Sequence, residues 1–87
     1  MARDELVGEV YELLLDGGPS LLDTVTAYLE QGSSLEATAR MLFVHPNTVR
    51  YRLRRVAELT GYTPAEGRGA FALWVSIVLG RLAGRSG

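Results

Sequence analysis

The nine residues from Asn47 to Arg55 concentrate side chains that can bind nucleic acid. They include four arginines, an asparagine, a threonine and a tyrosine, and no acidic residue lies between Ala37 and Ala57. Guanidinium groups bind phosphates and pair with guanine, asparagine can pair with adenine, and hydroxyl groups reach base edges or the backbone. The chemistry that these residue types favour is therefore recognition of a polyanion.

The spacing of aliphatic residues predicts that this stretch is an α-helix with one buried face. Pro46 suits the first helical position, because the amide that proline lacks would be unpaired there anyway. Val49, Leu53 and Val56 form an apolar stripe within a helix predicted from Pro46 to Thr60 and ended by Gly61. At about 100° per residue the opposite face is polar, cationic and aromatic. It carries Asn47, Tyr51, Arg54 and Glu58, with Arg50 and Arg55 on its flanks.

A short helix is predicted just before this one. Ser33 and Glu36 match a capping box, in which each side chain satisfies a free amide of the other residue. The helix would run from about Leu35 to Leu42 and bury Leu35, Ala39 and Leu42, with Ala37 and Thr38 as packing positions. Because only about four residues separate the two helices, the pair fits a helix-turn-helix.

Three further helices complete the predicted fold. Apolar residues recur at helical spacing from Leu6 to Leu14, and Asp16 to Pro19 end that helix. A second helix is predicted from near Ser20 to Gly32, and a last one from Thr63 or Pro64 to about Ala83. No segment alternates with the period of a strand. The chain is thus predicted to be all-α, a four- or five-helix bundle that contains the helix-turn-helix.

The last helix is apolar on more than one face. We expect its core stripe to consist of Phe71, Trp74, Val75, Val78 and Leu82, while Leu73, Ile77 and Leu79 lie off that stripe. A helix that is apolar all round must be covered on all sides. A second protomer or a missing domain would cover it, and a tightly wrapped terminal helix is the alternative.

Composition excludes several classes of function. The chain has no cysteine and one histidine among its 87 residues, so no thiolate site or multi-histidine metal site is possible. No spacing brings together a nucleophile, a base and an orienting group, and we expect neither an enzyme nor a cofactor or metal site. The apolar stretch from Ala70 to Gly80 is too short to span a bilayer, and Met1 to Leu15 are too acidic for a signal peptide. A soluble, cytoplasmic chain is expected.

Charge is distributed unevenly along the chain. Residues 1–36 hold one arginine and eight acidic residues, whereas residues 37–87 hold eight arginines and two acidic residues. Such an asymmetry indicates a polyanion-binding half. An arginine run on a helix is by itself more often a solvated face. Arg52 lies near the apolar stripe, where it could either pair with Glu36 or Glu58 or bind a phosphate.

Three residues at the start of the predicted recognition helix allow two interpretations. The first interpretation of His45 is a turn or N-cap residue, and the second is a phosphate contact. Asn47 and Thr48 could stabilise the first turn through local bonds between side chain and backbone, or they could contact bases.

Residues 34–56, SLEATARMLFVHPNTVRYRLRRV, resemble the C-terminal DNA-binding domain of the PucR (CdaR-like) transcriptional regulators of bacteria. Leu21 to Leu29 and Glu58 to Gly61 match this family as well, so that the likeness covers about residues 20–83. The resemblance implies a Fis-like helix-turn-helix. It also implies longer proteins in which an effector-sensing region precedes this domain.

With this resemblance, the sequence predicts specific binding of duplex DNA to regulate transcription. We assign the base contacts to Asn47, Thr48, Tyr51 and Arg54. We assign the phosphate contacts to Arg40, His45, Arg50, Arg52 and Arg55. The alternative is a helical interaction module whose arginine face docks on an acidic protein partner.

The resemblance also predicts the organisation of the chain. Residues 1–18 would form a leading helix that connects an absent effector-sensing domain to the DNA-binding domain, residues 19–87, and the alternative is a natural stand-alone protein. Two copies, joined through the apolar C-terminal helix, the N-terminal helix or both, would meet successive major grooves about 34 Å apart. A homodimer on a site of approximate two-fold symmetry is therefore expected.

Overall fold

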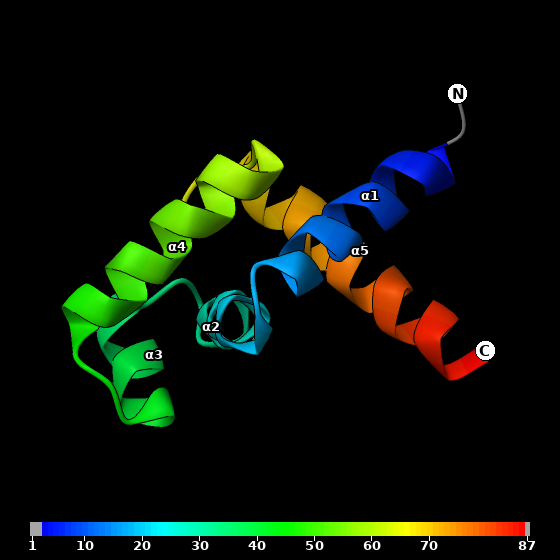
Figure 1. Ribbon diagram of the computed structural model, residues 1–87. Helices are drawn as coiled ribbons and strands as arrows, with labels where there is room; N and C mark the ends of the chain where they lie inside the picture. The colour runs from blue at the N-terminus through cyan, green and yellow to red at the C-terminus, as the bar shows by residue number, and fades with distance from the viewer. Residues whose placement is uncertain (1–2, 87) are drawn as a thin grey trace.

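Five α-helices make up residues 3–86, the part of the chain that the computed structural model describes, with side chains described from residue 8 to residue 84 (Figure 1). This confirms the all-α prediction and its five-helix form, since the described residues contain no strand. None of the described helices is both long and apolar enough to cross a membrane. The helices are α1 (Arg3–Asp16), α2 (Pro19–Glu30), α3 (Leu35–Leu42), α4 (Pro46–Thr60) and α5 (Gly67–Ser86).

Helix α2 lies at the centre and contacts each of the other four helices. Figure 1 shows α2 nearly end-on, with α3 and α4 on one side and α1 and α5 on the other. This arrangement buries one continuous core, to which every helix contributes. Its members are Val10, Leu14, Leu21, Val25, Tyr28, Ala39, Val49, Leu53, Val56, Leu73 and Ile77.

The predicted break between the first two helices is confirmed. Gly17 donates its amide to the Leu13 carbonyl at 3.2 Å, and Gly18 has a φ of 97°, a conformation that glycine adopts at little cost. Pro19 then begins α2. The side chains of Leu6 and Val7, which the sequence pattern assigned to the apolar face of the first helix, lie outside the described residues.

The predicted cap of α3 is wrong by one residue. Ser34, not Ser33, is the N-cap, and its Oγ accepts a hydrogen bond from the Ala37 amide at 3.1 Å. Ser33 instead has a φ of 65° and donates its amide to the Tyr28 carbonyl at the end of α2. Ala39 is buried as expected, whereas Leu35 and Leu42 are only half-buried.

Helix α5 begins at Gly67, later than the predicted start at Thr63 or Pro64. Residues 63–66 form a separate turn, in which the Glu66 amide donates to the Thr63 carbonyl at 3.1 Å. A Cβ at Gly69 would collide with the Thr63 backbone. Gly69 is therefore a close-packing residue, rather than merely a residue that weakens the helix.

The predicted core stripe of α5 is wrong. Leu73 and Ile77 are fully buried, while Phe71 is 71% exposed. In the rest of the expected stripe, Trp74, Val78 and Leu82 are also exposed and Val75 is half-buried. Leu79, which lies off that stripe, is exposed as well. Hydrophobicity could not distinguish the two faces, because both are apolar.

Small residues decide which face of α5 turns inward. Gly80 lies under the aromatic ring of Tyr11 on α1, where a Cβ would collide with the ring. Ser76 is buried on the same side, and its Oγ donates to the Ala72 carbonyl at 2.8 Å within the helix. The face with small residues lets the two helices approach closely, and the bulkier apolar face is left outside.

We expect Gly80→Ala to lower the free energy of unfolding by about 1–3 kcal/mol, because the added methyl group meets the Tyr11 ring in a packed interface. Gly84→Ala is the matched control four residues further along α5, where a Cβ meets nothing within 4 Å. The control should be neutral or slightly stabilising. Urea denaturation of both variants tests this, and equal effects would contradict the close packing of α1 on α5.

Candidate nucleic-acid interface

Helix α4 is anchored by one aliphatic stripe, as the sequence predicts. Val49 and Val56 are completely buried and Leu53 is buried, all three within the central core. Helix α4 also has the predicted bounds, Pro46–Thr60, and Gly61 ends it with a φ of 79°. Because the stripe faces the core, the opposite face of α4 must point to solvent.

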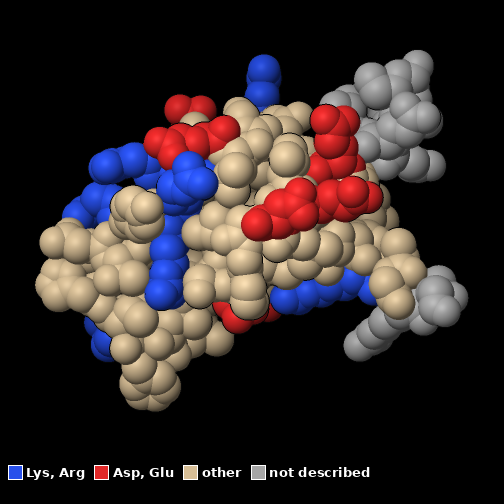
Figure 2. Space-filling model, viewed as in Figure 1, with Lys and Arg blue, Asp and Glu red and all other residues tan. Residues whose placement is uncertain are grey.

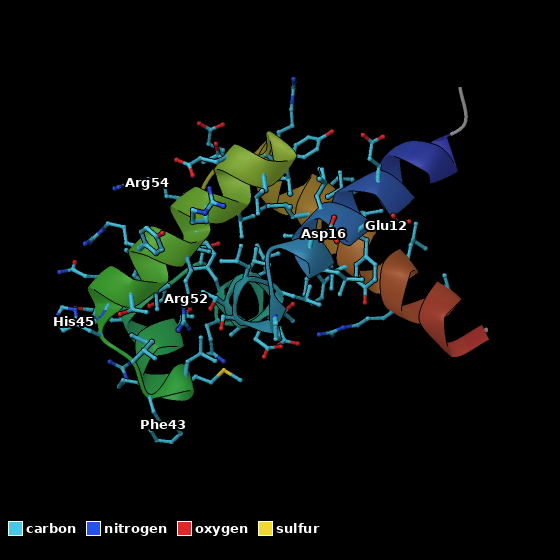
Figure 3. All side chains as sticks on the ribbon, in the orientation of Figure 1. Glu12, Asp16, Phe43, His45, Arg52 and Arg54 are labelled. Atoms are coloured by element: carbon cyan, nitrogen blue, oxygen red, sulfur yellow. The ribbon has the colours of Figure 1, made fainter. Side chains whose placement is uncertain are left out.

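His45 caps the start of α4. Its Nδ1 accepts a hydrogen bond from the Asn47 amide at 2.9 Å, and its carbonyl accepts one from the Thr48 amide at 2.9 Å. The N-cap interpretation is therefore confirmed, while a phosphate contact by His45 stays a prediction. His45 remains exposed at the N-terminal end of α4 (Figure 3).

A left-handed residue sets the turn between α3 and α4. Phe43 has φ 58° and ψ 43°, and the Val44 amide bonds back to the Ala39 carbonyl at 3.0 Å. This closure ends α3 and redirects the chain into α4. The Phe43 side chain is 93% exposed and points away from both helices (Figure 3).

The outward face of α4, which we define as Asn47, Arg50, Tyr51 and Arg54, is exposed to solvent. Arg50 donates from Nη1 to the Oδ1 of Asn47 at 2.6 Å. Arg54 projects from the outside of the helix (Figure 3). The Tyr51 side chain is 60% exposed. The four residues thus form one accessible surface.

Arginines on the opposite flank of α4 are partly engaged. Arg52 donates from Nη1 to the Oγ1 of Thr24 on α2 at 3.3 Å, and not to Glu36 or Glu58. Of the two alternatives for Arg52, the pairing with Glu36 or Glu58 is not formed, because its side of α4 faces α2, and the phosphate contact stays a prediction. Arg55 forms an ion pair with Glu58 at 2.8 Å on the surface, where such pairs contribute little to stability.

Other predicted residues lie around this surface. Thr48 is half-buried on the flank of α4, and Arg40 is exposed in the last turn of α3. Thr38 is fully buried and donates from Oγ1 to the Ser34 carbonyl at 2.6 Å, which confirms its packing role.

Sequence reasoning missed two residues near the interface. Thr24 is completely buried on α2 and accepts the bond from Arg52, and a polar residue beside the α2 apolar stripe was the available signal. Phe43 is the other residue: it follows the predicted end of the helix at Leu42 and has a positive φ, a conformation that favours glycine.

Charged side chains are unevenly spread over the face drawn in Figure 2, although acidic and basic groups also lie side by side on α4. In the view of Figure 2, arginines gather over α4, while a group of acidic side chains lies over α1 at the other end of the molecule. Opposite charge on the two ends favours one orientation when the protein approaches a polyanion. The uneven charge along the sequence thus gives, on this face, a concentration of arginines over α4.

A short supporting helix, a tight turn and a capped second helix with an exposed cationic face define a helix-turn-helix domain. Residues 21–79 match the family model described as the PucR C-terminal helix-turn-helix domain, and the chain belongs to this family. It is a DNA-binding domain of the transcription-regulator type, and this family is not one of enzymes.

Several known proteins are similar to this chain. An uncharacterised protein of Mycobacterium tuberculosis is 50% identical over 85% of the chain, which spans 18% of that protein. The purine catabolism regulatory protein of Bacillus subtilis is 38% identical over 72% of the chain, which spans 12% of it. The crystal structure of a regulator of polyketide synthase expression from Bifidobacterium adolescentis aligns with a TM-score of 0.87 and 46% identity, covering 93% of this chain and 34% of that one.

We expect Phe43→Gly to raise the free energy of unfolding by about 1 kcal/mol, because glycine adopts the left-handed conformation without the steric cost that a larger side chain bears. The exposed ring contributes little packing that could be lost. Thermal denaturation measures this change. Phe43→Val is the comparison, since a β-branched residue is more strained at a positive φ, and a more stable valine variant would contradict the assigned turn.

Proposed function

We propose that this chain binds duplex DNA in a sequence-specific manner, as the DNA-binding domain of a PucR-like regulator. The outward face of α4 enters the major groove, with the start of the helix nearest the base edges. The observation that carries this proposal is the rotation of α4, which buries Val49, Leu53 and Val56 and leaves Asn47, Tyr51 and Arg54 exposed.

Base contacts and phosphate contacts divide between the centre and the flanks of α4. Asn47, Thr48, Tyr51 and Arg54 read bases in this proposal, because they lie on or beside the outward face of α4. Arg50 and Arg55 lie at its sides, where phosphates border the groove. Arg52 reaches a phosphate only from the α2 side. Arg40 does so from the last turn of α3, and His45 does so from the start of α4.

Substitutions on α4 should separate the two kinds of contact. Arg54→Ala and Asn47→Ala should each weaken binding to a selected duplex by roughly 1–3 kcal/mol and relax base preference. Arg55→Ala should weaken all duplexes alike. Fluorescence anisotropy on selected and scrambled duplexes, at several salt concentrations, measures both effects.

Arg68→Ala is the matched control, because it removes one exposed arginine from the start of α5. It should change both affinities little. Equal losses on selected and scrambled duplexes for all the α4 variants would contradict base reading. Binding to an acidic polypeptide as tight as binding to DNA would favour the protein-docking alternative.

We further propose that two copies associate through the exposed face of α5. Phe71, Val75, Val78 and Leu82 follow one another at spacings of four, three and four residues, which is the pattern of a helix seam that packs on a second helix. Trp74 and Leu79 border that seam and are also exposed. A second copy offers the same apolar stripe, so the contact is self-complementary.

The rest of a PucR-like regulator would join this domain through α1. The chain spans 18% of the M. tuberculosis relative, so that much of such a protein lies elsewhere. We propose that residues 1–18 connect an effector-sensing domain to residues 19–87. Contacts of α1 with α5 and α4 support this proposal, since they would fix the direction in which the connecting helix enters.

Phe71→Glu and Leu79→Glu should convert the dimer to a monomer, because each places a charge on an apolar contact between copies. Both side chains are exposed, so the fold should be kept. Phe43→Glu is the control, since it changes an exposed aromatic residue at the other end of the molecule. Sedimentation velocity measures the mass, and a monomeric parent chain would contradict the proposed association.

A further inference from the structure

We propose, building on the proposed function, that the outward face of α4 reads hydrogen-bond acceptors in the major groove and so selects guanine at the contacted positions. The inference comes from two exposed side chains of α4 that have strong acceptor oxygens, Asn47 on this face and Glu58 beyond it. Each of them is already bonded to a neighbouring arginine. What remains for DNA is a surface composed mainly of donors.

Asn47 is the first of these two residues. Its Oδ1 accepts a bond from Arg50 Nη1 at 2.6 Å, one turn further along α4. The amide group then presents Nδ2 and its two N–H donors to the groove. Adenine pairs with asparagine through one donor and one acceptor of the amide. The Oδ1 of Asn47 is turned toward Arg50 and has one of its two lone pairs occupied, so its pairing with adenine N6 is weakened.

Glu58 is the second of these residues. Its Oε1 accepts from Arg55 Nη1 at 2.8 Å. A carboxylate is the side chain that reads the N4 donor of cytosine. Pairing of Glu58 with Arg55 removes part of that capacity, and Glu58 lies beyond the half of α4 that is nearest the turn.

The remaining polar groups on or beside the outward face of α4 are hydrogen-bond donors, or they do not favour either kind of base edge. The Nδ1 of His45 is the acceptor for the Asn47 amide, so the proton of a neutral ring lies on the exposed Nε2. Arg54 contributes only donors and extends outward (Figure 3). The hydroxyls of Thr48 and Tyr51 both donate and accept, and they select neither kind of edge.

Guanine is the base that best matches such a surface. It offers two adjacent acceptors, N7 and O6, in the major groove, whereas adenine offers one acceptor beside a donor and cytosine offers a donor. Thymine offers one acceptor, O4, beside a methyl group. Donors of Asn47 and Arg54 therefore gain most from guanines that face α4.

Selection of bound duplexes from a random pool, with the intact chain, is the first step of the test. Replacement of each selected guanine by 7-deazaguanine, which lacks the N7 acceptor, then identifies the contacted positions. The inference predicts that at least one such replacement weakens binding about fivefold or more. A pool without any shared sequence would contradict the proposed function itself.

Arg50→Ala is the second step, because it frees the Oδ1 of Asn47. At one contacted position, the preference for guanine over adenine should fall about fivefold or reverse. Arg68→Ala removes the same charge and should leave that preference unchanged. A shared sequence read at adenine or cytosine by the parent chain, or an unchanged preference in Arg50→Ala, would overturn this inference while the proposed function stands.

Discussion

The burial of three aliphatic residues on α4 is the constraint on which the rest of the interface depends. Val49, Leu53 and Val56 occupy the centre of the core, and burial of each such side chain contributes about 1.5–3 kcal/mol. A rotation of α4 by a quarter turn would expose this stripe and bury arginines instead. The outward direction of the cationic face is therefore a consequence of core packing.

Caps and turns fix the residues at which α3 and α4 begin and end, and so the position of α4 relative to α3. Ser34 begins α3, Phe43 ends it in a left-handed conformation, and His45 begins α4. Each feature satisfies amides or carbonyls that helix ends leave unpaired. Since only three residues lie between the two helices, little freedom remains in the angle between them, and α4 projects from the bundle as a fixed element.

The bundle behind α4 depends on small residues as much as on large ones. Gly69 admits the Thr63 backbone and Gly80 admits the Tyr11 ring, so α5 can lie close to its neighbours. The same orientation of α5 leaves Phe71 and Trp74 exposed on its outer side. The apolar surface on α5 thus arises from the packing that stabilises the domain, and it lies on a different helix from the cationic face of α4.

The sequence by itself determined the helical class, the bounds of α4 and its buried stripe, because a polar helix with one apolar face has only one favourable orientation. Only the tertiary structure decided the orientation of α5, since both of its faces are apolar and the choice depended on the fit of Gly80 against Tyr11. The partner of Arg52 was likewise decided in three dimensions. Thr24 is 28 residues away along the chain, and only the packing of α4 on α2 brings the two side chains together.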